Sequence, residues 1–303
     1  MRSRNEHGQA TVLTLVMLTV LLGMAALVLD IGSWYRADRH TQSAADAAAL
    51  AGAQALPYDA ANATSLANQY IAKNGGGDVS VNLSNSFGPN DTISVNLKRP
   101  APGIFTRIFG VSSVNVGSKA TARVDAPTKA RWVAPIVVNK LHPDLKGTTS
   151  CPCFGPGNET TLPLGKAGAP GAFDLLNLDQ GHGGTSPGIL SDWIMKGYDG
   201  YLPIGGYFSD PGAKFDSSQI QAALQARIGS VLLFPVYDTL TGGGANATYH
   251  VIGWVGFHLD SFTARGNSGT LTGYFTQVIW DGIQSETGSN QPDFGTRSVQ
   301  LID

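Results

Sequence analysis

The chain has 303 residues, and its 20 lysines and arginines against 22 acidic residues give a formal net charge of -2. Hydrophobic residues make up 42%, which is enough for a core and excludes a wholly disordered chain. Charged residues are only 14%, so the chain lacks the Lys/Arg clusters that nucleic acids require, and nucleic-acid binding is excluded. Low charge and 38 glycines favour an exported, mostly β protein, and the length suggests two domains.

The N-terminal region contains a long apolar segment. Ala10–Leu29 is a run of 20 residues without a charged side chain, and as a helix it would span ~30 Å, the thickness of a bilayer's hydrocarbon core. Trp34 and Tyr35 follow where an interfacial aromatic belt would lie. A cleaved signal peptide is the alternative, but its apolar region usually has about 7–15 residues. We therefore predict a leader over residues 1–9 and a retained transmembrane helix over residues 10–30.

The orientation of this helix follows from what lies on each side of it. Lys/Arg counts on the two flanks do not decide it. The short N-terminal tail and the large, charge-poor body favour an N-terminus in the cytoplasm and an extracytoplasmic body. We expect a single-pass membrane protein, with membrane lipid as a partner.

The helical pattern continues beyond the apolar run. Residues 31–56 are rich in alanine, the best helix former, and Pro57 ends the segment. Two interpretations of the alanines remain open. They are either part of a spacer helix lying on its own domain, or a surface on which neighbouring helices pack closely.

Three short motifs in this region carry a family resemblance: Gly8-Gln9-Ala10, Asp30-Ile31-Gly32 and the run Gln42–Ala51. In this order they resemble the N-terminal region of TadE/TadG-like proteins of Flp (tight-adherence) pilus systems. The resemblance implies a bacterial single-pass membrane protein, similar to a minor pilin, that assembles or anchors a thin pilus. It also implies other pilus or secretion-system subunits as partners.

The same resemblance bears on maturation and helix packing. A prepilin peptidase would cut after Gly8, leaving Gln9 as the new terminus, and would then be a further partner. Pilins carry a glutamate at the fifth mature position, where this chain has Leu13. We therefore expect an accessory subunit present in few copies. Its membrane helix would pack through the small residues Gly23, Ala25 and Ala26. Asp30 would be a polar anchor at the membrane surface.

The body divides near Ala126-Pro127. Residues 57–126 predict a helix at 60–74, a hairpin with strands at 79–83 and 93–97, a short helix at 102–110 and a strand at 114–124. This is a small pilin-like α+β head. Residues 127–303 predict a mostly β extracytoplasmic module, with strands at 133–138, 231–237, 249–262 and 270–280, helices at 188–196 and 217–228, and a long loop at 141–188. The predicted fold class is membrane-anchored α+β.

Few residues of the body point to chemistry. Cys151 and Cys153 favour a local disulfide whose loss is tolerated, with free thiols or a metal site as alternatives, although the spacing matches no zinc pattern. Asp179, His182 and Ser186 share a glycine-rich loop that shows no catalytic triad. We predict no catalytic, cofactor-binding or metal-binding residues and no enzyme. The alternative functions are a surface-anchored protein that recognises carbohydrate or protein through its β module, and an exported hydrolase.

Overall fold

The computed structural model describes residues 6–145, 153–165, 175–210, 214–243, 246–265, 268–280 and 292–302. The chain forms two compact units, one of residues 1–124 together with Val299–Asp303, and one of Asp125–Ser298. The boundary lies close to the predicted junction at Ala126-Pro127, but the last residues return to the first unit.

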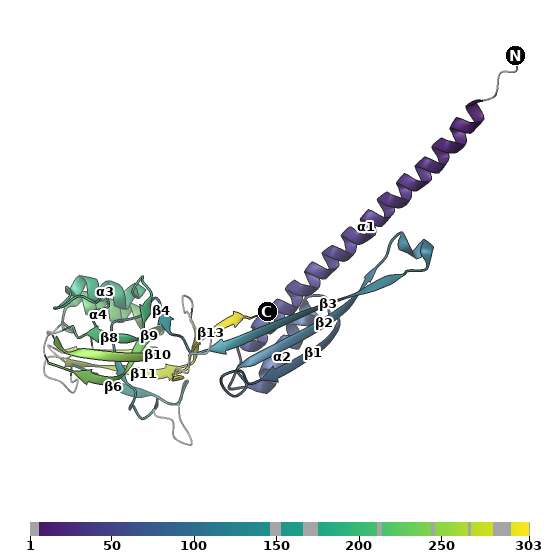
Figure 1. Cartoon of the computed structure of the whole chain (residues 1–303). Coiled ribbons are helices and arrows are strands. Elements are labelled where there is room, and N and C mark those ends of the chain that lie inside the picture. Colours follow the sequence, from purple (N-terminus) through teal and green to yellow (C-terminus); the bar gives the residue numbers. More distant parts are fainter. Residues whose placement is uncertain are drawn as a thin grey trace, which may run out of the picture. The chain divides into compact units, whose positions relative to one another are not determined.

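The first unit is built on one long helix, α1 (Glu6–Ala53), which carries the N-terminal apolar run and the alanine-rich segment without a break (Figure 1). Pro57 follows it, and a second helix, α2 (Ala60–Lys73), begins at Asp59, whose side chain accepts a hydrogen bond of 2.8 Å from the backbone N–H of Asn62. A glycine triplet with positive φ at Gly75, Gly76 and Gly77 ends α2.

An antiparallel sheet completes the first unit. β1 (Asp78–Ser84) pairs with β2 (Thr92–Pro102), which pairs along its whole length with β3 (Ser113–Asp125). The final strand, β13 (Thr296–Leu301), lies next to β3 in the same sheet. A short 3-10 helix, η1 (Thr106–Phe109), sits in the turn between β2 and β3, where the sequence predicted a longer helix over 102–110.

The alanines of α1 form part of the core of this unit. Ala45, Ala48, Ala49 and Ala53 are completely buried and pack with α2 and the inner face of β2 and β3. Gly52 lies at a close approach of α1 and α2, because a Cβ there would be 2.8 Å from the carbonyl oxygen of Ala63. The alanine-rich segment therefore packs within the first unit, against α2 and the sheet.

The second unit is mostly β. Its main sheet has the order β5 (Val138–Asn139), β9 (Val231–Thr241), β10 (Thr248–Arg265), β11 (Ser268–Thr276) and β6 (Thr160–Leu164), and β8 (Gly205–Phe208) also pairs with β10. The short strands β4 (Lys129–Ala130) and β7 (Leu202–Pro203) pair with each other. β12 (Val278–Ile279) runs parallel to the start of β13.

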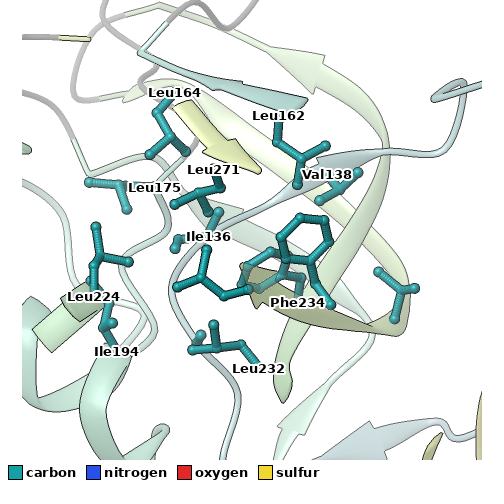
Figure 2. Packing of buried hydrophobic residues seen from close by; sticks show 14 of the residues in the cluster. Ile136, Val138, Leu162, Leu164, Leu175, Ile194, Leu224, Leu232, Phe234 and Leu271 are labelled. Atoms are coloured by element: carbon teal, nitrogen blue, oxygen red, sulfur yellow. The ribbon is translucent and has the colours of Figure 1, made fainter. Parts of the chain in front are cut away.

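Two helices cover the sheet of the second unit. α3 (Pro187–Lys196) begins with Ser186 as its N-cap and Pro187 in its first turn, and α4 (Ser218–Arg227) packs beside it. Ile194 of α3 and Leu224 of α4 point into a core that also contains Phe234 of β9 and Leu271 of β11 (Figure 2). This core gives the second unit its own apolar interior.

Two predictions for the second unit were wrong. Residues 133–138 do not form a continuous strand, because Pro135 has no N–H to donate and only isolated bridges form at Val133 and Ile136 before β5 begins. The predicted loop over 141–188 contains β6, an edge strand that pairs with β11 despite Pro163. The predicted fold class, a long apolar helix joined to α+β structure and a mostly β C-terminal region, is confirmed.

The close approach of α1 and α2 provides a test of this arrangement. We expect Gly52→Leu to lower the free energy of unfolding of the first unit by about 1–3 kcal/mol, because the added side chain overpacks the contact with Ala63. The matched control is Gly32→Leu in the same helix, where a Cβ has no described atom within 4 Å. Denaturant unfolding followed by hydrogen exchange in α2 measures the difference. Equal effects at the two positions would contradict the packing.

Candidate functional site

The N-terminal half of α1 presents its apolar side chains outward. Of the helices in the described part of the chain, α1 is the one long and apolar enough to cross a membrane, and its most apolar window is 0% buried. Leu13, Leu21 and Val28 are each more than half exposed. A core helix of a soluble protein would bury such side chains, so this segment fits a single-pass membrane anchor.

Asp30 follows the apolar run directly and is completely buried. Its Oδ1 accepts a hydrogen bond of 2.9 Å from the backbone N–H of Ile104, and its Oδ2 accepts bonds of 3.0 Å from Phe105 and 2.6 Å from Thr106. One carboxylate therefore satisfies three consecutive N–H groups at the start of η1. The sequence predicted a polar anchor at the membrane surface, whereas the structure gives Asp30 partners within its own chain.

Further contacts fasten α1 to the β2–β3 hairpin. Trp34 donates from Nε1 to the carbonyl of Pro102 at 3.3 Å, one turn beyond Asp30. Farther along, Gln42 Nε2 donates to the carbonyl of Lys119 at 3.1 Å. These bonds hold the hairpin against α1 from its tip to the alanine-rich core.

Asp91 makes a similar clamp at the opposite hairpin turn of the same sheet. Its carboxylate accepts hydrogen bonds from the backbone N–H groups of Ser86, Phe87 and Gly88 at 2.6–2.8 Å. Burial raises the pKa of Asp91, but these bonds outweigh burial and keep the pKa below its ordinary value. Asp30 and Asp91 are thus two buried carboxylates of this unit that each bind the backbone N–H groups of a hairpin turn.

The small residues of the membrane segment have no partner within the described chain. Gly23 and Ala25 are exposed, Ala26 is partly exposed, and a Cβ at Gly23 would meet no described atom within 4 Å. Gly8 and Gln9 lie in the first turn of α1, and nothing is described of the side chains there. Packing through the small residues and cleavage after Gly8 therefore stay predictions.

The residues singled out in the second unit do not assemble into a catalytic group. Ser186 accepts from the backbone N–H of Ile189 as a helix cap, and the His182 ring contacts the Phe208 ring at a tilt of 37°, with 3.8 Å between centroids. Cys153 is disulfide-bonded, and Cys151 lies outside the described residues, so their predicted pairing stays a prediction. Among the described residues, no three His, Cys, Asp or Glu side chains are placed to hold a metal.

One polar network in the second unit was not predicted. Asp210 is completely buried; it pairs with Lys214 and accepts a bond of 2.9 Å from the backbone N–H of Thr185. Burial raises the pKa of Asp210, while the bonds from Lys214 and Thr185 act in the opposite direction. The network joins the segment before α3 to the one after β8, which is a structural role.

Comparison with known proteins identifies the N-terminal segment. Residues 8–55 match the family described as "Putative Flp pilus-assembly TadE/G-like", which confirms the resemblance inferred from the sequence. The match covers α1, both its exposed apolar half and its buried alanine half. No curated protein and no solved structure matches the chain.

The bonds of Asp30 predict a local response to its removal. In Asp30→Ala, the N–H groups of Ile104, Phe105 and Thr106 lose their acceptor, and we expect their amide exchange to accelerate by roughly tenfold or more. Exchange in α2 should change little. The matched control is Asp91→Ala, which should release Ser86–Gly88 and leave the η1 turn protected. Unchanged exchange at Ile104–Thr106 in Asp30→Ala would contradict this role.

Proposed function

We propose that this chain is a non-enzymatic, membrane-anchored component of an Flp-type pilus or a related secretion system, acting in pilus assembly or anchoring. The match of residues 8–55 to the TadE/G-like family carries the proposal. The exposed apolar half of α1, long enough to cross a membrane, supports it. The protein acts by position and contact with other subunits, not by chemistry.

The geometry suggests how the anchor and the head work together. In our proposal, residues 10–30 cross the cytoplasmic membrane with the N-terminus inside, and the body stands on the outer side. Because α1 continues without a break into the core of the first unit, the head cannot swing freely on a linker. The helix therefore presents the head to neighbouring subunits at a defined height above the membrane.

The membrane segment itself offers weak contacts for polymerisation. Leu13 stands where pilins carry a carboxylate, and it is largely exposed. The hydroxyls of Thr14 and Thr19 donate to carbonyls of their own helix at 2.9 Å, so these protons are not offered to neighbouring helices. What remains is close packing through Gly23, Ala25 and Ala26, and hydrogen bonds between membrane helices contribute only ~0.6–2 kcal/mol each. We infer an accessory, minor-pilin-like subunit in few copies.

Copy number and membrane retention test the proposal together. We expect the full chain to stay in the membrane fraction through an alkaline carbonate wash, and deletion of its gene to reduce piliation. Sheared, purified pili should contain it far below the level of the major pilin, as measured by quantitative mass spectrometry. The N-terminal peptide from the same measurement reports whether the chain begins at Gln9.

Two outcomes would contradict the proposal in different ways. Stoichiometric amounts of the chain along purified pili would show it to be a shaft subunit. Normal piliation in the deletion strain, with the protein still retained in the membrane, would instead favour a separate surface-anchored binding protein acting through its second unit.

A further inference from the structure

The tip of the β2–β3 hairpin, residues 103–112, carries large apolar side chains that no part of the described chain covers. Ile108 and Phe109 are each 81% exposed, and Ile104 is 62% exposed. The remaining apolar members, Phe105 and Val111, are also exposed. A soluble surface seldom gathers so many large apolar side chains on one turn, so the tip has a function outside the folded core.

The position of the tip along α1 is set by hydrogen bonds. Asp30, the first residue after the apolar run, holds the backbone of Ile104, Phe105 and Thr106. The tip therefore lies beside α1 at the end of its membrane-length segment. Figure 1 shows the β2–β3 hairpin reaching the middle of α1. The exposed apolar run of the helix therefore ends at the level along α1 where the exposed apolar side chains of the tip are held.

The chemistry around the tip is that of a membrane–water interface. Arg107 is the only charged residue within the tip and is exposed, where it can reach lipid phosphates. Tyr35 is 60% exposed on α1 at the same end, and Trp34 bonds to Pro102 at the base of the tip. Aromatic side chains and an arginine beside an apolar surface favour lipid headgroups and upper acyl chains over a purely aqueous setting.

We propose that this tip is a second membrane contact: Ile104, Ile108 and Phe109 insert into the outer leaflet beside α1, with Arg107 at the headgroups. The inference rests on the proposed membrane anchoring by α1. A bilayer, and not a partner protein, is the occupant because Asp30 holds the tip at the level where the exposed, membrane-length run of α1 ends. Two contacts, a helix and a hairpin tip, would restrict tilting of the first unit on the membrane.

Fluorescence quenching in vesicles tests this contact on the full-length chain. With Cys151→Ser and Cys153→Ser as background, Phe109→Cys, Phe87→Cys and Leu18→Cys are each labelled with an environment-sensitive fluorophore. The proteins are reconstituted into vesicles of phosphatidylethanolamine and phosphatidylglycerol. Phe87 is the matched control, since it is an exposed phenylalanine in the opposite hairpin turn, and Leu18 reports on the helix in the bilayer.

We expect a nitroxide carried near the lipid headgroup to quench most of the emission at position 109, and aqueous iodide to quench little. Position 87 should show the reverse, and position 18 should be quenched best by a nitroxide deep in the acyl chains. Adding Asp30→Ala to the Phe109→Cys protein should reduce the lipid quenching, because the tip is no longer held at the membrane.

Each other result overturns the inference in a recognisable way. Quenching of position 109 by iodide alone, with position 18 still quenched by lipid, would show a tip in water and leave the anchor standing. Protection of position 109 from both quenchers would show a protein covering the tip. If lipid fails to quench position 18, membrane anchoring itself fails.

Discussion

The first unit depends on one helix that runs without a break from an exposed apolar segment into a folded core. A helix satisfies its own backbone N–H and C=O groups, so it can cross from lipid to protein with no exposed polar backbone, as a loop at that place could not. No proline occurs in α1, and its composition changes from large exposed leucines and valines to small buried alanines. The small alanines allow α2 and the sheet to pack closely against the second half of α1, whereas the large side chains of the first half stay exposed.

Asp30 lies between the exposed apolar half and the buried half of α1. Its hydrogen bonds satisfy both its own carboxylate and the N–H groups at the start of η1. An ionised carboxylate next to an apolar segment is costly unless hydrogen bonds replace its water. The start of η1 has N–H groups with no partner inside the helix, and these are the donors that Asp30 accepts from. The hairpin tip and the end of the membrane-length segment therefore stabilise each other, and neither can be moved without leaving polar groups unpaired.

Local patterns in the sequence were sufficient for the elements whose signals lie within themselves. Helices α1 and α2 follow from alanine content, periodicity and the glycine triplet after α2, and the strands around the first hairpin follow from alternation. The elements that were missed depend on distant partners: β6 contains Pro163 and pairs with β11 more than a hundred residues later. The bonds of Asp30 reach residues 74–76 positions away, so no local signal could have shown them, although the aspartate itself stood out.

Of the two interpretations of the alanine-rich segment, the structure supports a helix that packs on its own domain. This packing limits where other subunits can bind. Ala45, Ala48 and Ala49 are buried against α2 and the sheet of the same unit, so a neighbouring helix cannot reach them without unfolding the head. The family match over residues 8–55 thus spans a segment buried in the first unit and an exposed apolar segment long enough to cross a membrane. Contacts of α1 with other subunits are left to its exposed residues, such as Leu21 before Asp30 and Tyr35 after it.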